Sequence, residues 1–165
     1  MIVKQDLLKW IRNADRRLER SITLVAVGGT AMTLLGLKPS TIDVDLCITS
    51  KDKKDFEKSI GNNFKVDLFV DGFIFSEQLP SDYIQKSKDI LQLKNIMLKA
   101  LSPLDIIITK AARLNARDEE EISLLARYVN KEELIERFKE VVGTYVGNAN
   151  IYRHNFEFVV RRFFK

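Results

Sequence analysis

Residues 21–48 read SITLVAVGGTAMTLLGLKPSTIDVDLCI and combine two apolar runs with a glycine pair between them. The β-branched run 21–27 predicts a short buried strand, which Gly28-Gly29 ends. Residues 30–37 predict a short helix, and Pro39 disfavours helix at the residue before it. Glycines at a strand-to-helix junction allow unusual backbone angles and the close approach of a ligand, but for the glycine pair alone a tight turn without a ligand is the favoured explanation.

A second strand is predicted over residues 43–48, where apolar and other side chains alternate. Because side chains two residues apart share one face of a strand, Asp43 and Asp45 point the same way, and Val44 points toward the core. Neighbouring carboxylates repel each other unless a cation lies between them, and Mg²⁺ prefers oxygen ligands. The structural alternative is a solvated strand edge that carries two surface acids.

Asp67 lies in a third predicted strand, residues 64–70, on the face opposite Val66, Leu68 and Val70. If this strand pairs with that of Asp43 and Asp45, three carboxylates converge on one cation site. Two-metal phosphoryl transfer uses such a site to activate the attacking oxygen and to stabilise the leaving phosphate. Asp71 is a competing third acid, but its position before Gly72 is typical of a turn.

The rest of the chain predicts helices over residues 4–20 and 51–60 and a hairpin formed by residues 88–93 and 96–101. From Pro103 onward the pattern is helical throughout, over residues 103–115, 118–129, 131–142 and 148–164. We therefore predict an α+β fold, with a mixed sheet flanked by helices and a C-terminal helical half. Residues 1–101 form the predicted core and residues 102–165 pack on it in one compact unit.

Composition limits the chemistry, because the 165 residues include one His and one Cys. An intramolecular disulfide and a zinc site built from these ligands are excluded, so any bound metal is a hard cation held by carboxylates. Cys47 is predicted to be a small buried residue, and His154 to lie on the polar face of the last helix. The absence of an apolar run of about 20 residues predicts a cytoplasmic protein without a membrane partner.

The formal net charge is +4, but it is unevenly distributed along the chain. Residues 1–20 and residues 151–165 each carry a net charge of +3, which leaves the central part at −2. A plain nucleic-acid-binding module is therefore disfavoured, because such modules need a dense basic surface.

The joint pattern resembles a known family. Val27-Gly28-Gly29 is followed, after residues 30–42, by Asp43-Val44-Asp45-Leu46 and later by Asp67. This resembles the nucleotidyltransferase superfamily of the DNA polymerase β type, and most of all its small prokaryotic abortive-infection and toxin–antitoxin members.

The resemblance implies a role for each matched residue. Gly28, Gly29 and Thr30 would bind the phosphates of a nucleotide, and Asp43 and Asp45 would hold Mg²⁺. The remaining acid, Asp67, would help to bind a second Mg²⁺ ion and activate the acceptor hydroxyl. Two ions are expected in the active complex, and Mn²⁺ is an expected substitute.

A secondary resemblance concerns the helix that starts at Pro103. Several of these small transferases carry a Lys and an Arg in this helix, which match Lys110 and Arg113. The two residues are neighbours on one helix face and could contact a triphosphate. The alternative is that they pair with Asp118 or Glu121, and the sequence does not choose between the two.

The function implied is Mg²⁺-dependent transfer of a nucleoside monophosphate from a nucleoside triphosphate to an acceptor hydroxyl, with release of pyrophosphate. Protein, tRNA and small molecules are the acceptor classes that remain open. The alternative is a catalytically silent protein of the same fold that acts as an antitoxin-like or nucleotide-sensing binding partner. A toxin–antitoxin partner or a second copy of the chain is the expected protein partner.

Overall fold

The computed structural model describes all 165 residues, which divide into two units. The first unit comprises residues 1–72 and 84–101, and the second comprises residues 73–83 and 102–165. The division predicted from the sequence, 1–101 and 102–165, differs from this one in residues 73–83, which belong to the second unit.

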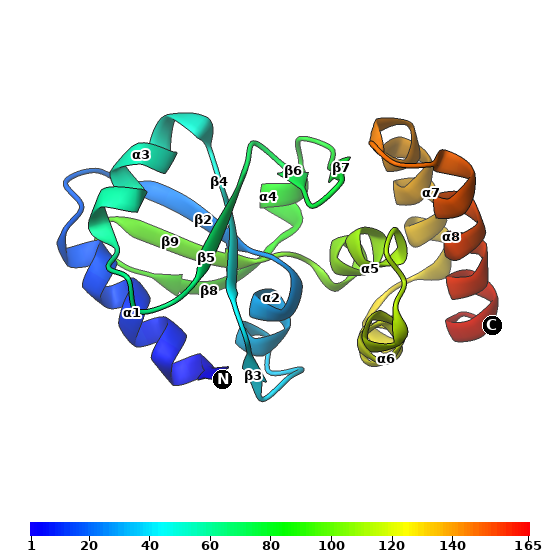
Figure 1. The fold of residues 1–165 in the computed structure, drawn as a ribbon, viewed down its shortest axis with the longest axis horizontal. Coiled ribbons are helices and arrows are strands. Elements are labelled where there is room, and N and C mark those ends of the chain that lie inside the picture. The colour runs from blue at the N-terminus through cyan, green and yellow to red at the C-terminus, as the bar shows by residue number, and fades with distance from the viewer. The chain divides into compact units, whose positions relative to one another are not determined.

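A mixed sheet lies at the centre of the first unit (Figure 1). Its strands are β2 (Ile22–Ala26), β4 (Val44–Ile48), β5 (Val66–Val70), β8 (Lys88–Gln92) and β9 (Ile96–Ala100). They lie in the order β5-β4-β2-β9-β8. The central strand β2 is antiparallel to β4 and parallel to β9, β4 is parallel to β5, and β8 is antiparallel to β9. The predicted mixed sheet and the predicted hairpin are both confirmed.

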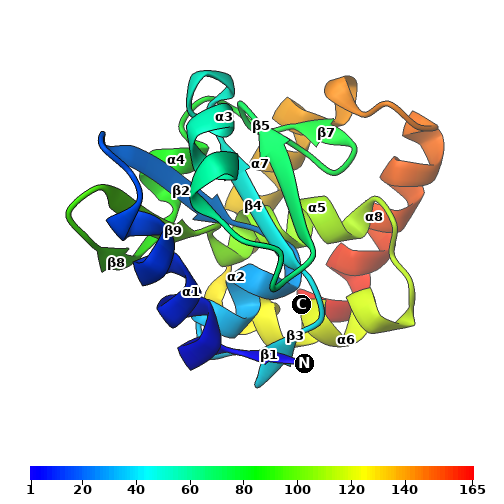
Figure 2. The same cartoon turned by 60° about the vertical axis from the view of Figure 1, so that its left-hand side comes forward.

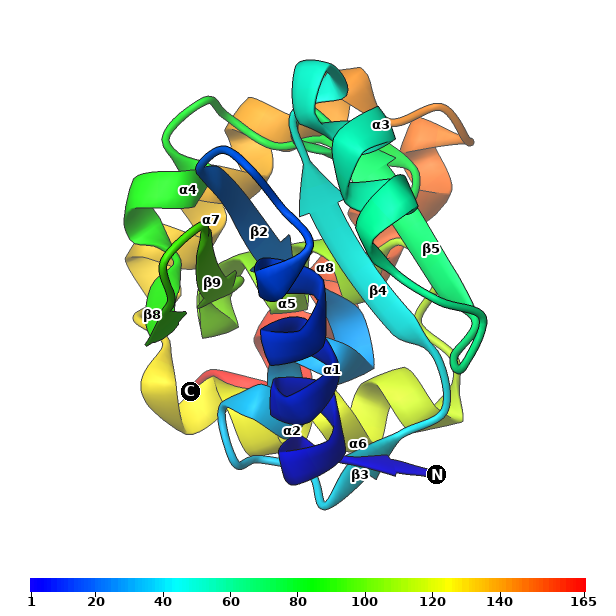
Figure 3. The same ribbon diagram turned by 90° about the vertical axis from the view of Figure 1, so that its left-hand side faces the viewer.

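The helices of this unit are α1 (Lys4–Arg16), α2 (Gly28–Leu34) and α3 (Ser50–Ser59). Figure 3 shows α1 and α3 together on one face of the sheet, where Trp10 meets Phe56 edge to face with ring centroids 6.0 Å apart. The first helix is shorter than predicted. Its end is fixed by Asp15, whose Oδ1 accepts hydrogen bonds from the backbone N–H groups of Asn95 and Ile96 at the turn between β8 and β9.

A two-stranded sheet that was not predicted joins β1 (Ile2–Val3) to β3 (Ser40–Thr41) near the N-terminus (Figure 2). Each strand has two residues, which is too short to show an alternating pattern. Because β3 lies between α2 and β4 in the chain, this sheet fixes the segment that leads into Asp43.

The second unit begins with a hairpin of β6 (Phe73–Ile74) and β7 (Glu77–Gln78), and the short helix α4 (Tyr83–Lys86) lies at the boundary. Its main helices are α5 (Pro103–Ala111), α6 (Ala116–Leu125), α7 (Lys131–Val141) and α8 (Ala149–Phe163). Ser102 caps α5 by accepting a hydrogen bond from the Asp105 N–H, and Pro103 occupies the first helical position. Short 3₁₀ turns follow α6 and α7, so the predicted helices over 118–129 and 131–142 end earlier as α-helix.

Aromatic side chains of α7 and α8 pack together in the core of the second unit. The ring of Phe138 on α7 stacks on Phe156 of α8 with centroids 3.9 Å apart, and it meets Tyr152 edge to face. His154 is exposed on α8 and Cys47 is buried in β4, both as predicted. None of the helices has the length and apolar character that crossing a membrane requires.

Candidate functional site

The glycine pair lies where β2 passes into α2. Gly28 has a φ of +54°, a backbone angle that glycine adopts at little cost and most other residues avoid. The preceding residue, Val27, donates its N–H to the Asp45 carbonyl at 3.0 Å. The turn is therefore tied directly to the strand that carries the Asp-x-Asp pattern.

Gly29 packs closely against β3. A β-carbon at this position would lie 3.1 Å from Thr41 Oγ1, closer than ordinary van der Waals contact. The Thr41 hydroxyl also donates to the Asp43 carbonyl at 3.0 Å. A small residue at position 29 thus lets the segment before Asp43 lie against the first turn of α2.

The buried hydroxyl of Thr30 links the glycine turn to the segment that carries Asp43 and Asp45. Its Oγ1 donates to the Asp43 carbonyl at 3.1 Å and accepts from the Asp45 N–H at 2.9 Å. The residue is 1% exposed. Its hydroxyl therefore holds the backbone of both acids in place, a role that the predicted phosphate contact does not include.

The three candidate acids lie at the ends of two neighbouring strands. In the parallel pairing of β4 with β5, Asp45 is directly opposite Asp67. Paired positions of adjacent strands lie about 5 Å apart with side chains on the same face, so these carboxylates are neighbours. Asp43, one residue before β4, is half-buried like Asp45, whereas Asp67 is exposed. Val44, Leu46 and Ile48 are buried on the opposite face, as predicted.

Carboxylate oxygens are the ligands that Mg²⁺ prefers, so the donor set of Asp43, Asp45 and Asp67 suits this ion chemically. The structure does not gather three or more acidic, His or Cys side chains into a ready-made metal cluster. The strand register and the donor chemistry are what favour a metal role of these acids. Asp71 lies in the turn after β5, as predicted, and its carboxylate accepts from the Ser50 N–H at the start of α3.

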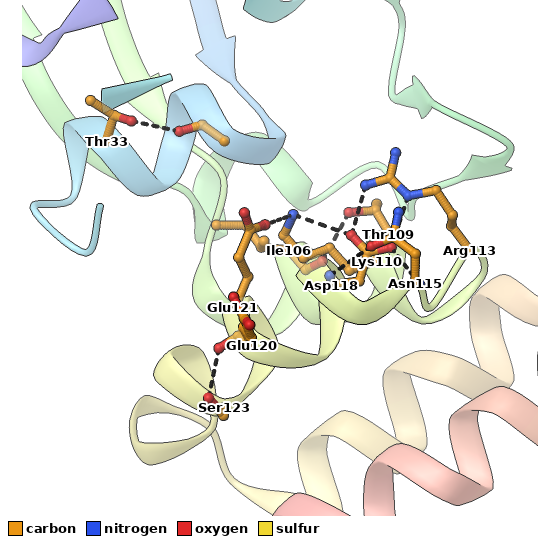
Figure 4. Close-up of polar contacts among 11 residues, drawn as sticks. Thr33, Ile106, Thr109, Lys110, Arg113, Asn115, Asp118, Glu120, Glu121 and Ser123 are labelled. Atoms are coloured by element: carbon orange, nitrogen blue, oxygen red, sulfur yellow. Dashed lines mark hydrogen bonds and ion pairs between the residues drawn. The ribbon is translucent and has the colours of Figure 1, made fainter. Parts of the chain in front are cut away.

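Lys110 and Arg113 lie in the second unit, around the carboxylate of Asp118 (Figure 4). The side chain of Lys110 is 6% exposed, forms an ion pair with Glu121, and places Nζ 3.8 Å from Asp118 Oδ1. Arg113 donates through Nε and Nη2 to the two Asp118 oxygens at 2.8 and 2.7 Å. These ion pairs match the alternative that the sequence left open, and the nucleotide contact of both residues stays a prediction.

Asp118 itself is held in its charged form. Burial raises the pKa of its carboxyl group, but hydrogen bonds from Arg113 and from the Asn115 N–H outweigh burial and bring the pKa below its usual value. Asn115 and Asp118 also cap each other's backbone N–H groups at the start of α6.

Two residues beside the glycine pair, Lys38 and Thr41, were not predicted from the sequence. Both lie on the side of Gly29 where a β-carbon would be, and Lys38 Nζ is 3.6 Å from the position that this β-carbon would take. Thr41 gives a weak local signal, because it lies two residues before the first acid and can cap the segment by a side-chain hydrogen bond. Lys38 gives none, since only the fold brings it back to residue 29.

The different roles of two buried threonines on α2 give a test of the link between the glycine turn and the acids. Thr33, one turn after Thr30, is also 1% exposed, but its hydroxyl donates only to the Gly29 carbonyl of the same helix (Figure 4). We expect Thr30→Val to lower Mg²⁺-dependent nucleotide affinity about tenfold, because the Asp45 N–H loses its hydrogen-bond partner and the acids shift.

Thr33→Val is the matched control and should leave that affinity within about twofold, while Thr30→Ser should restore it. Isothermal titration calorimetry with Mg²⁺ and a nucleoside triphosphate measures the affinity, and thermal unfolding checks that each variant is folded. Equal losses in Thr30→Val and Thr33→Val would show that the effect comes from general weakening of α2.

The chain was compared with known proteins at three levels. A family model described as "Nucleotidyltransferase of unknown function (DUF6036)" matches residues 1–163. No curated protein sequence matches significantly. The solved structure of ANT(2″)-Ia in complex with adenylyl-2″-tobramycin is similar in fold, with a TM-score of 0.53 and 13% identity over 91% of this chain and 96% of that chain.

A nucleotidyltransferase candidate from Thermotoga maritima is a second similar structure, with a TM-score of 0.43 and 13% identity. That match covers 61% of this chain and 80% of the other. The family match extends over almost the whole length, across both units. The chain belongs to this family of nucleotidyltransferases.

Proposed function

We propose that the chain transfers a nucleoside monophosphate from a nucleoside triphosphate to an acceptor hydroxyl, with Mg²⁺ as cofactor. The observation that carries the proposal is the arrangement of the acids. The Asp43–Asp45 segment is fixed to the glycine turn by Thr30, and Asp67 lies beside Asp45 in the strand register. Family membership supports nucleotidyl transfer as the reaction.

In the proposed reaction the acceptor oxygen attacks the α-phosphorus, and the bond from this phosphorus to the bridging oxygen of the β-phosphate breaks. Pyrophosphate leaves, and the proton of the acceptor hydroxyl passes to the Asp67 carboxylate, which acts as general base. Bound Mg²⁺ would neutralise phosphate charge, with Asp43 and Asp45 as its ligands. Gly28, Gly29 and Thr30 would lie beside the phosphates.

Asp67 suits the role of general base by its position. It is exposed, so an acceptor can reach it, and it lies opposite the acid that would hold the metal. The other two acids are half-buried, and their backbone groups are hydrogen-bonded to the Thr30 hydroxyl of α2, which suits a fixed ligand pair better than a mobile base.

Nucleotide binding gives the first test. We expect at least one of the four common ribonucleoside triphosphates to bind in calorimetry with Mg²⁺ and to lose about tenfold or more of its affinity without it. The variant Asp43→Ala/Asp45→Ala should lose this Mg²⁺-dependent part, because the remaining acid is one carboxylate on another strand. The matched control is Glu19→Ala/Glu57→Ala, which removes two exposed acids of the same unit.

Equal affinity with and without Mg²⁺, unchanged in the Asp43/Asp45 double variant, would contradict the carboxylate site. Transfer of a label from the α-phosphate to protein, tRNA or an aminoglycoside then identifies the acceptor class. Mg²⁺-dependent binding without transfer to any acceptor would favour the silent binding protein instead. The cytoplasmic location stays a prediction from the composition, and a toxin–antitoxin partner stays a prediction from the resemblance.

A further inference from the structure

A lysine ammonium group lies close to Gly29, on the side where a β-carbon would be. Position 29 has no side chain, and Lys38 Nζ lies 3.6 Å from the point where a β-carbon would be. Thr41 Oγ1 lies 3.1 Å from the same point and donates to the Asp43 carbonyl. A positive charge thus lies close to the second glycine of the turn, on the side where Thr41 also packs.

The chain reversal after α2 brings Lys38 close to Gly29. Gly36 has a φ of +76° and donates its N–H to the Thr33 carbonyl, which reverses the chain after the helix. The N–H groups of Leu37 and Lys38 then both donate to the Met32 carbonyl, at 2.9 and 3.3 Å. With its backbone held at Met32, the half-buried Lys38 side chain extends back along the helix to Gly29.

The charges in the first unit make this position significant. Asp43, Asp45 and Asp67 supply negative charge for a metal ion, but a nucleoside triphosphate is itself an anion, so its phosphates gain from positive charge nearby. A cation on the glycine side of the acids would bind those phosphate oxygens that the metal ion does not contact. A lysine ammonium, a point charge with three donors, is suited to phosphate.

Lys110, the lysine that the secondary resemblance offers for phosphate, lies in the second unit and is buried with Glu121 and Asp118. Lys38 lies in the first unit, against the glycine turn that the family resemblance assigns to phosphate binding.

We propose that Lys38 contacts the phosphate chain of the nucleoside triphosphate and makes the site select triphosphates over monophosphates. This inference rests on the proposed function, because it takes the triphosphate as the substrate. Its direct consequence is that the contribution of Lys38 grows with the number of phosphates on the ligand.

The test compares Lys38→Met with wild type by calorimetry in Mg²⁺, using the triphosphate that wild type binds most tightly and the matching monophosphate. We expect Lys38→Met to weaken triphosphate binding about tenfold or more, since a charge-assisted hydrogen bond is lost, and monophosphate binding less than about twofold. Lys38→Arg should retain most of the triphosphate affinity. Lys53→Met, which removes a half-buried lysine of α3, is the matched control and should bind both ligands like wild type.

The outcomes separate the inference from the proposed function. Tight triphosphate binding by wild type that is unchanged in Lys38→Met overturns the role of Lys38 and leaves nucleotidyl transfer standing. Equal losses for triphosphate and monophosphate also overturn it, because they indicate a general distortion of the turn. If wild type binds no triphosphate, the proposed function fails and the inference about Lys38 fails with it.

Discussion

Asp67→Asn is expected to reduce nucleotidyl transfer about a thousandfold while the protein still binds its nucleotide. Asn has nearly the same shape as Asp but cannot accept the acceptor's proton, and general base catalysis contributes about 10²–10⁴-fold to enzymatic rates. Because Asp67 is exposed on β5, the substitution should change the free energy of unfolding by less than about 0.5 kcal/mol.

Asp45→Asn is expected to behave differently, although the two residues are partners in the strand register. As a proposed metal ligand, Asp45 should affect Mg²⁺-dependent nucleotide affinity as well as the rate. If Asp67→Asn loses only rate, Asp67 acts as a base. If Asp45→Asn loses both rate and nucleotide affinity, Asp45 acts as a metal ligand. Single-turnover transfer of labelled nucleoside monophosphate measures the rate, and calorimetry measures the affinity.

Asp89→Asn is the control for removal of one negative charge from the same sheet. Asp89 lies on β8, its side chain is 70% exposed, and it forms an ion pair with Lys99. Its substitution should leave rate and affinity unchanged within about twofold. If Asp67→Asn keeps full transfer activity, Asp67 is not the base, and the acceptor proton must leave by another path.

The part of the site predicted from the sequence depends on short-range regularities. Asp43 and Asp45 share a strand face because side chains alternate, and Gly28 marks a turn because its φ is positive. The strand of Asp67 is recognisable by the same alternation. Its exact register beside Asp45 follows from the pairing of two strands that are separated by a helix, which no local pattern specifies.

Contacts between distant residues account for what the sequence did not predict. Residues 73–83 belong to the second unit because the Val146 N–H donates to the Ser76 carbonyl and the Gln78 N–H donates to Thr144 Oγ1. Both partners are more than sixty residues further along the chain. Lys110 could have been anticipated as a buried residue, because the surrounding sequence LDIIITKAA is apolar on every side, as in a core helix.

The hairpin of residues 73–83 contains a buried acid, Glu77, for which the structure predicts a pH-dependent stability. Glu77 on β7 is 0% exposed, and neither carboxylate oxygen has a hydrogen-bond partner. Burial raises the pKa of this carboxyl group to about 8, against the opposing effect of the Ser76 backbone, which is close but does not meet the geometry of a hydrogen bond. Burial and then the charge of Glu77 also raise the pKa of Tyr152 on α8, so the two side chains interact within the second unit.

The direction of this pH dependence follows from the protonation of Glu77 in the folded and in the unfolded chain. In the unfolded chain Glu77 ionises near its ordinary pKa of 4.5, whereas in the folded chain it keeps its proton up to about pH 8. Between these values the folded state binds the additional proton, so the free energy of unfolding falls as the pH rises. Each unit of pKa difference corresponds to about 1.4 kcal/mol, which makes the loss at pH 8 several kcal/mol.

Glu77→Gln removes the titrating group and keeps the size of the side chain. We expect the variant to gain several kcal/mol of stability relative to wild type on going from pH 5 to pH 8, measured by urea unfolding at both values. The control Glu136→Gln changes an acid of α7 whose side chain is 69% exposed and should show the wild-type pH dependence. An identical pH dependence in Glu77→Gln and wild type would mean that Glu77 is ionised in the folded state. In that case the carboxyl group of Glu77 would not be buried without a partner, because an ionised carboxylate needs a cation or hydrogen-bond donors around it.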